Sequence, residues 1–209
     1  MNNMTSRKYF NIWQQNVVKS STSQHDLLAK ADPNKWDIIA LQEPYLNHLQ
    51  LTQANQHWMV MYPSNKNLQG QACTHSIILI NKKIDSPQIQ QINIPSSDIT
   101  AIKISTRNRS LIVINLYNNI NLNLNIAAIA DMWNTHGNGW TSGNDPTEVI
   151  LLGDFNHHHS MWEPSKNDNL KSLDCLLNPL LELIINMRLE MILLCSTPTL
   201  EACNTGNWT

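Results

Sequence analysis

Short runs of apolar residues recur along the chain, and most of them have the length of a β-strand. The run DIIAL at residues 37–41 shows no polar alternation, which is typical of a strand buried on both faces. Similar patterns predict strands at residues 9–18, 37–41, 58–62, 76–81, 99–104, 110–116, 148–152 and 189–194. The tetrad at 106–109 resembles a hairpin turn, so the strands on either side of it are expected to pair.

Apolar residues at helical spacing predict helices at residues 21–31, 121–133 and 170–187. The first helix has three polar residues at 21–23 that can serve as its N-cap, and Asp32-Pro33 follows as a stop signal. Residues 136–146 are rich in Gly, Asn and Asp, which predicts an exposed loop.

The alternation of these elements predicts an α/β fold with more strands than helices. Because hairpins mix with crossovers, we expect two mixed sheets packed face to face with helices outside, a four-layer α/β sandwich. The 209 residues suit one large domain spanning 1–209, and no repeat, low-complexity tract or linker divides it.

The composition and net charge exclude some classes of protein but do not identify a function. A formal net charge of -2 excludes a strongly basic nucleic-acid-binding surface over the whole molecule, so any grip on DNA must come from a local patch. The candidate basic residues are Lys8, Lys19, Lys82, Lys83, Arg107 and Arg109. The four cysteines form no CxxC pair, no signal peptide is recognised, and no apolar run is long enough to span a membrane. These features predict a soluble intracellular protein.

Polar clusters stand at or directly after the ends of four of the predicted strands. They are Gln14-Gln15-Asn16, Gln42-Glu43-Pro44, Tyr117-Asn118-Asn119 and Gly153-Asp154-Phe155-Asn156. Carboxylates can hold a hard divalent cation and orient an attacking water, while neutral Asn and Tyr donors can bind phosphate oxygens without adding negative charge. Each group also has a simpler interpretation as a capping, turn or packing residue. Four such groups in succession favour phosphodiester hydrolysis.

In this order the motifs QQN, LQEP, NLYN and GDFN resemble the endonuclease/exonuclease/phosphatase superfamily, which includes exonuclease III-type repair nucleases, DNase I, inositol-polyphosphate phosphatases and sphingomyelinases. The stretch at 153–162 is similar to the narrower GDFN-x-HH-x-x-W signature of endonuclease domains in non-LTR, LINE-type retrotransposons. The resemblance covers the whole chain and implies a DNase I-like sandwich.

The resemblance also implies a role for each motif residue. Glu43 is expected to be the principal ligand of Mg²⁺, with Mn²⁺ as a substitute, and Asn16 to support the metal or the phosphate. Tyr117 is expected to contact the scissile phosphate, and Asp154 with Asn156 to position the nucleophilic water. The implied partners are DNA and a downstream reverse-transcriptase domain of a parent polyprotein, with nuclear action and no membrane.

Two departures from the family pattern stand out. Val18 occupies a position where repair members carry an acidic residue. The family pattern closes with a late Asp and an Asp-His pair after the element seen here at 197–199, whereas no His follows His159. The sequence therefore predicts a domain truncated at its C-terminus, without its terminal strands and without that catalytic pair.

Three consecutive histidines, His157, His158 and His159, directly follow Asn156. We interpret them as residues that orient the loop and bond to its backbone, rather than as a zinc site or a replacement for the absent His. Trp162 is expected to pack that loop; base stacking is the alternative.

Two hypotheses follow. The first is a Mg²⁺-dependent endonuclease that nicks one DNA strand and leaves a 3′-OH for reverse transcription. The second is a non-catalytic relic of such a domain, with weak or no DNA binding. A repair nuclease or a lipid-head phosphatase fits the HH-x-x-W loop less well. Carboxylates of Glu43 and Asp154 more than about 10 Å apart could not share one metal–phosphate site and would contradict the first hypothesis.

Overall fold

The computed structural model describes residues 9–66, 74–107, 109–119, 123–141, 147–159, 161–162 and 174–193. The chain forms two compact units, Met1–Phe155 and Asn156–Thr209, and each is described by itself below. The expectation of one domain over 1–209 stays a prediction. No helix in the described ranges is both long enough and apolar enough to span a membrane.

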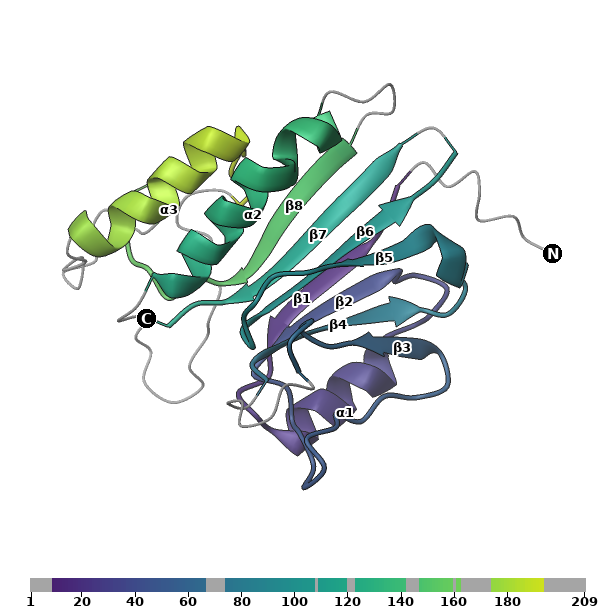
Figure 1. Ribbon diagram of the computed structural model, residues 1–209. Helices are drawn as coiled ribbons and strands as arrows, with labels where there is room; N and C mark the ends of the chain where they lie inside the picture. Colours follow the sequence, from purple (N-terminus) through teal and green to yellow (C-terminus); the bar gives the residue numbers. More distant parts are fainter. Residues whose placement is uncertain are drawn as a thin grey trace. The chain divides into compact units, whose positions relative to one another are not determined.

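The first unit contains two four-stranded sheets (Figure 1). The first sheet has the order β1-β2-β4-β3 and is built from β1 (Ile12–Asn16), β2 (Ile38–Gln42), β3 (Trp58–Met61) and β4 (Ser76–Asn81). The second has the order β5-β6-β7-β8 and is built from β5 (Ile89–Ile92), β6 (Ile99–Ser105), β7 (Ser110–Tyr117) and β8 (Thr147–Asp154). The pairs β1–β2 and β7–β8 are parallel and the others antiparallel, so both sheets are mixed as predicted.

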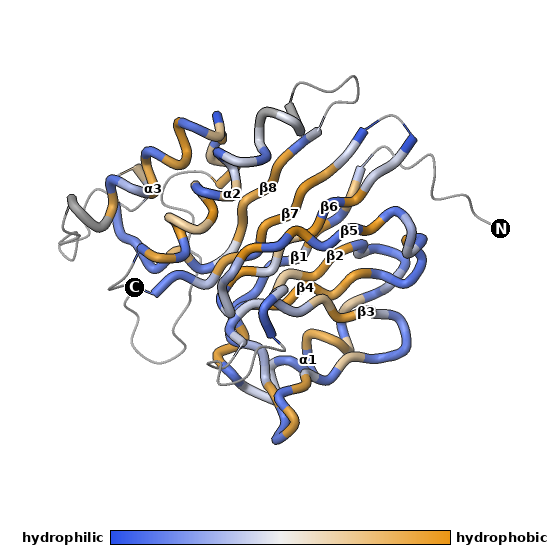
Figure 2. Tube along the Cα trace, in the orientation of Figure 1, coloured by the Kyte–Doolittle hydropathy of each residue, from blue (hydrophilic) through white to orange (hydrophobic). Residues whose placement is uncertain are grey.

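The apolar runs of the central strands are buried on both faces. In β2, Ile38 faces the second sheet, while Ile39 and Leu41 belong to the cluster on the opposite face. The cluster between the sheets joins Ile38, Ile78, Ile80, Ile84, Ile102, Ile104, Leu111 and Val113. Figure 2 shows the apolar residues running along the strands of both sheets. Because every second residue of a strand points to the same face, only a strand covered on both sides needs apolar residues throughout.

Helix α1 (Ser21–Lys30) covers the outer face of the first sheet through Leu27. Its N-cap is Ser20, whose hydroxyl accepts a hydrogen bond of 3.2 Å from the backbone N–H of Ser23. The predicted cap at residues 21–23 is therefore wrong by one residue, because Ser20 is the last residue with extended backbone before the helix. A short 3-10 helix, η2 (Ser86–Gln88), precedes β5.

Helix α2 (Leu124–Thr141) is longer than the sequence predicted. Ile126, Ile129 and Met132 are buried along one face. The expected loop at 136–146 is wrong for residues 136–141, which are helical; residues 142–146 lie outside the described part. The ring of Trp140 contacts that of His136 one turn earlier, with 5.9 Å between centroids, and that of Trp133 two turns earlier, with 6.0 Å. These contacts offset the low helix propensity of the Gly and Asn residues in this part of the helix.

The second unit contains α3 (Asp174–Met187), which lies within the helix predicted at 170–187. Residues 170–173 of the predicted helix lie outside the described part. The helix ends at Met187, and Arg188 follows it with a φ of 54° that turns the chain. The strand predicted at 189–194 is wrong for residues 189–193, which pair with no described strand. Their apolar side chains, including Ile192 at 83% exposure, mimic a strand in sequence without a neighbouring strand to supply hydrogen bonds.

Candidate active site

The side chain of Asn16 links the two carboxylates that the sequence singled out. Its Nδ2 donates to Glu43 Oε1 at 3.1 Å and to Asp154 Oδ2 at 2.9 Å. The two acceptor oxygens can therefore be no farther apart than these two distances together, about 6 Å. Asn16 and Glu43 are neighbours because β1 and β2 are parallel and in register, with Asn16 opposite Gln42. The separation is well inside the limit of about 10 Å for a shared metal–phosphate site.

The orientation of the Asn16 amide is fixed by the backbone. The N–H of Val18 donates to Asn16 Oδ1 at 2.9 Å. Because an N–H can only donate, the amide oxygen must face Val18 and the NH₂ group must face the carboxylates. The contact uses only the backbone of Val18, whose side chain is 70% exposed, so the departure from the family pattern at this position leaves the contact intact. A role for Asn16 as a metal ligand stays a prediction.

Glu43 adopts a backbone conformation that is rare for a residue with a side chain. Its φ is 46°, in the left-handed region. Two backbone hydrogen bonds hold it there: its N–H donates to His75 O at 2.8 Å, and Lys19 N–H donates to its carbonyl at 2.7 Å. Strained residues of this kind cluster at functional sites, where the surrounding structure over-determines them.

Tyr117 and Asp154 end the neighbouring parallel strands β7 and β8 and are register partners. Burial raises the pKa of the Tyr117 phenol, and the negative charges of Glu43 and Asp154 and a hydrogen bond with Glu43 raise it further. The phenol therefore stays neutral over a wide pH range. A neutral hydroxyl beside two carboxylates is a donor for a phosphate oxygen.

Gly153 allows Asp154 its place opposite Tyr117. The φ of Gly153 is 138°, and a Cβ added there would lie 1.9 Å from the carbonyl oxygen of Leu116. Only glycine permits this approach of β8 to β7. The N–H of Asn118 then donates to the carbonyl of Asp154 at 2.8 Å and ties the two strand ends together.

Sequence reasoning missed a second polar group at the same edge, formed by His75, Asp98 and Asn125. His75 Nδ1 lies 2.8 Å from Asp98 Oδ1, and Asn125 Nδ2 donates to Asp98 Oδ2 at 3.2 Å. Burial would raise the pKa of Asp98, but hydrogen bonds from His75 and Asn125 and the charge of His75 together lower it. The ring of His75 contacts that of Tyr117, with 5.2 Å between centroids.

The sequence feature that could have identified His75 and Asp98 is their position directly before a strand. His75 directly precedes β4 and Asp98 directly precedes β6. Because β4 runs antiparallel to β2, and β6 antiparallel to β7, the starts of these strands lie at the same edge as the ends of their neighbours. Polar residues before a strand were therefore candidates as well as those after one.

A chain of three amides, of which those of Gln42 and Asn115 are buried, joins the two sheets next to the carboxylates. Gln14 Nε2 donates to Gln42 Oε1 at 2.6 Å, and the Gln42 amide donates in turn to Asn115 Oδ1. Asn115, on β7 of the second sheet, donates back to the carbonyls of Leu41 at 3.0 Å and Ile77 at 2.8 Å in the first. This network fixes the position of Asn16 and Glu43 relative to Tyr117 and Asp154.

The fifth predicted site residue, Asn156, begins the second unit. It has a left-handed backbone with a φ of 51°, a conformation that Asn tolerates better than most residues. Its role beside Asp154 stays a prediction.

The histidine loop of the second unit is held by its own side chains. Trp162 Nε1 donates to the carbonyl of His157 at 3.0 Å, and Met161 N–H donates to His159 Nδ1 at 3.2 Å. The rings of His159 and Trp162 are in contact, with 5.1 Å between centroids. Burial, with a smaller contribution from His158, lowers the pKa of His157. These contacts agree with the interpretation that His159 and Trp162 shape the loop.

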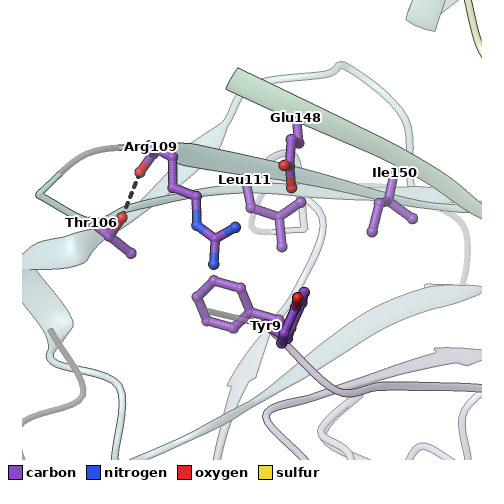
Figure 3. Close-up of a pocket in the computed structure, with 7 residues that line it drawn as sticks. Tyr9, Thr106, Arg109, Leu111, Glu148 and Ile150 are labelled. Atoms are coloured by element: carbon purple, nitrogen blue, oxygen red, sulfur yellow. Dashed lines mark hydrogen bonds between the residues drawn. The ribbon is translucent and has the colours of Figure 1, made fainter. Parts of the chain in front are cut away.

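A cavity of about 280 Å³ lies at the opposite ends of β7 and β8 (Figure 3). Its lining residues are Tyr9, Phe10, Thr106, Arg109, Leu111, Glu148 and Ile150. It is one strand length, roughly 20 Å, from the carboxylates. With Glu148 as its one carboxylate, it lacks the acidic pair that hydrolysis requires.

Within the described ranges no group of three or more His, Cys, Asp or Glu residues is arranged to hold a metal ion. The candidate site thus offers two carboxylates and neutral amide and phenol groups. Such a set suits a cation that keeps part of its water shell rather than one enclosed by protein ligands.

Comparison with known proteins agrees with this description. Residues 9–209 match the model of the Endonuclease/Exonuclease/phosphatase family, whereas no curated protein matches the chain. The fold is similar to that of the endonuclease domain of TRAS1, a telomere-specific non-LTR retrotransposon, at 19% identity and a TM-score of 0.61, with 84% of this chain and 71% of that chain covered. It is also similar to an AP endonuclease from Leishmania major, at 10% identity and a TM-score of 0.63, with 85% and 66% covered.

These similarities confirm the α/β sandwich of two mixed sheets that the sequence predicted. The match to the family model extends over nearly the whole chain and includes all four motifs. The chain therefore belongs to the endonuclease/exonuclease/phosphatase family.

Proposed function

We propose that this chain is a Mg²⁺-dependent DNA endonuclease that hydrolyses one phosphodiester bond and leaves a nick with a free 3′-OH. The observation that carries the proposal is the link from Asn16 to Glu43 and Asp154, which brings carboxylates from two sheets within about 6 Å. The neutral phenol of Tyr117 stands beside both. This is the donor and acceptor set that phosphodiester hydrolysis requires.

The donor set fits a hard divalent cation. Glu43 and Asp154 offer carboxylate oxygens, the ligands that Mg²⁺ and Mn²⁺ prefer, and two carboxylates leave room for the retained water and a substrate phosphate. When bound, such a cation neutralises negative charge that develops on the phosphate oxygens. Glu43 is the proposed principal ligand.

The side chains themselves have separate tasks. Asp154 accepts a hydrogen bond from the attacking water and orients it, since its second oxygen is already held by Asn16. When substrate is bound, the phenol hydrogen of Tyr117, which bonds to Glu43 in the structure, is donated to a phosphate oxygen. Asn16 keeps the two carboxylates at a fixed separation, which lowers the cost of bringing like charges together. Asn156 is proposed to contribute a further amide contact to the phosphate.

The proposed substrate is DNA, and the proposed setting is a retrotransposon polyprotein with a reverse-transcriptase domain that extends the nicked 3′ end in the nucleus. The GDFN-x-HH-x-x-W signature at 153–162 and the similarity in fold to the TRAS1 endonuclease domain support this setting. The Leishmania protein of similar fold is an AP endonuclease by its title, which supports an endonuclease activity.

The test is the nicking of supercoiled plasmid by the full chain with Mg²⁺ and with EDTA. We expect open circles only with Mg²⁺, and a loss of about 100-fold or more in Glu43→Gln, because a metal ligand contributes several kcal/mol of charge stabilisation. Glu148→Gln is the matched control, a carboxylate on β8 at the opposite end of the sheet. A folded wild-type protein that leaves the plasmid supercoiled would instead indicate the non-catalytic relic.

A further inference from the structure

The side chain of His75 is hydrogen-bonded to the carboxylate of Asp98, which is itself fixed by further hydrogen bonds. Its Nδ1 and Asp98 Oδ1 are 2.8 Å apart, and because an ionised carboxylate only accepts, Nδ1 carries the hydrogen. Asp98 also accepts from Asn125 and from the Ser97 hydroxyl at 3.3 Å, while the Ser96 hydroxyl accepts from its N–H at 3.0 Å. The imidazole is thus pre-organised rather than free to rotate.

The same pair is bonded through the backbone to two residues of the candidate site. Glu43 N–H donates to the carbonyl of His75, and Tyr117 N–H donates to the carbonyl of Asp98 at 2.9 Å. The His75 ring also lies against the Tyr117 ring. The imidazole is therefore next to the phenol proposed to contact the phosphate, at the edge where both sheets present their polar ends.

The second ring nitrogen of His75, Nε2, has no hydrogen-bond partner among the residues the structure describes, and the side chain is 23% exposed. The negative charges of Glu43, Asp154 and Asp98 all act on the Tyr117 phenol, the group proposed to contact an anionic phosphodiester. Asn16 and Tyr117 supply only neutral donors there. Packing against Tyr117 alone does not require the His75 ring to be oriented by the Asp98 carboxylate, which is half-buried and fixed by several hydrogen bonds.

We infer that His75 binds a phosphate oxygen of the DNA strand through Nε2–H, with Asp98 as its positioning residue. This inference rests on the proposed function and adds to it a charged phosphate contact from the edge between β4 and β6. The carboxylate accepts from Nδ1 and so orients the ring, as an Asp does for a His in other hydrolytic sites.

The experiment compares wild type, His75→Phe and a matched control, His57→Phe, an exposed histidine at the opposite end of β4. Phenylalanine keeps the ring against Tyr117 and removes both nitrogens. Binding of a fluorescent DNA duplex is measured in EDTA at several salt concentrations and one fixed pH. Nicking of plasmid in Mg²⁺ gives kcat and KM, and thermal melting shows that each variant is folded.

We expect the negative slope of log K against log salt to become less steep by about 0.9 in His75→Phe, the value for one lost phosphate contact. We expect kcat/KM to fall about 10- to 100-fold. The control should leave the slope and kcat/KM unchanged. Should His75→Phe fail to fold, His75→Gln takes its place, since its amide still bonds to Asp98 but carries no charge; the same slope change is expected.

An unchanged slope in a folded His75 variant would overturn the inference, whether or not nicking falls, because a packing role does not change counterion release. So would a wild type that binds no duplex at any salt concentration. A wild type that binds but does not nick contradicts the proposed function alone, and the slope then still decides the role of His75.

Discussion

Replacing Gly153 by alanine should unfold the edge of the second sheet on which Asp154 stands. The added Cβ would lie 1.9 Å from the Leu116 carbonyl oxygen and 2.8 Å from the carbon and nitrogen of the same residue, all of them backbone atoms that cannot rotate away. The φ of 138° alone costs a residue with a side chain about 1–3 kcal/mol. Relieving the clash separates β7 from β8, and each ladder hydrogen bond lost adds about 1 kcal/mol. We expect a loss of about 4 kcal/mol, a large share of the stability of a typical domain.

The assay is urea denaturation followed by circular dichroism, with Gly139→Ala as the matched control. Gly139 lies in α2, and a Cβ there meets nothing within 4 Å, so alanine should raise stability by up to about 1 kcal/mol through helix propensity. If the two variants differ in unfolding free energy by less than about 1 kcal/mol, the close approach of β7 and β8 at Leu116 is not what requires glycine.

Two further predictions concern the buried polar groups. Asn115→Ala should cost about 3–5 kcal/mol in urea denaturation, because it leaves the Gln42 amide and two backbone carbonyls without their donor or acceptor in a dry interior; a loss under about 1 kcal/mol would show that the amide network does not bind the sheets. Asp98 has a pKa below its ordinary value of 3.8 in the folded protein, so its contribution to stability is present above that value and is lost as the pH falls through the lower folded pKa. The melting temperature of Asp98→Asn should therefore fall less than that of wild type on acidification from about pH 5 to about pH 2, and parallel curves would contradict the lowered pKa.

The buried strands were the most predictable part of the fold. The predicted segments 76–81 and 99–104 agree with β4 and β6 to within one residue, because strands covered on both faces are apolar throughout. β5 was missed since its two central residues are glutamines on an edge strand. The end of α2 was missed because contacts of Trp140, rather than local propensity, make it helical.

The candidate site was predictable where polar residues stand at the ends of apolar strands. Asn16, Glu43, Tyr117 and Asp154 were all selected on that basis, and the structure brings them together, while their chemical roles stay predictions. The pairing of His75 with Asp98 was not predictable in the same way. It depends on which strands are antiparallel neighbours, and strand order is a property of the assembled sheets rather than of any one segment.

The hydrogen bonds of Asn16 also have a consequence for the newly made chain. Its two acceptors lie 27 and 138 residues away in sequence, the nearer in the same sheet and the farther in the other. Contacts of such long range form late, because the entropy of closing the intervening loop must be overcome first. During translation the first sheet can assemble with Glu43 in place while Asp154 is still unmade. The acidic pair is complete only once β8 has been synthesised and docked, so a nascent chain lacks the proposed hydrolytic site until its sandwich is closed.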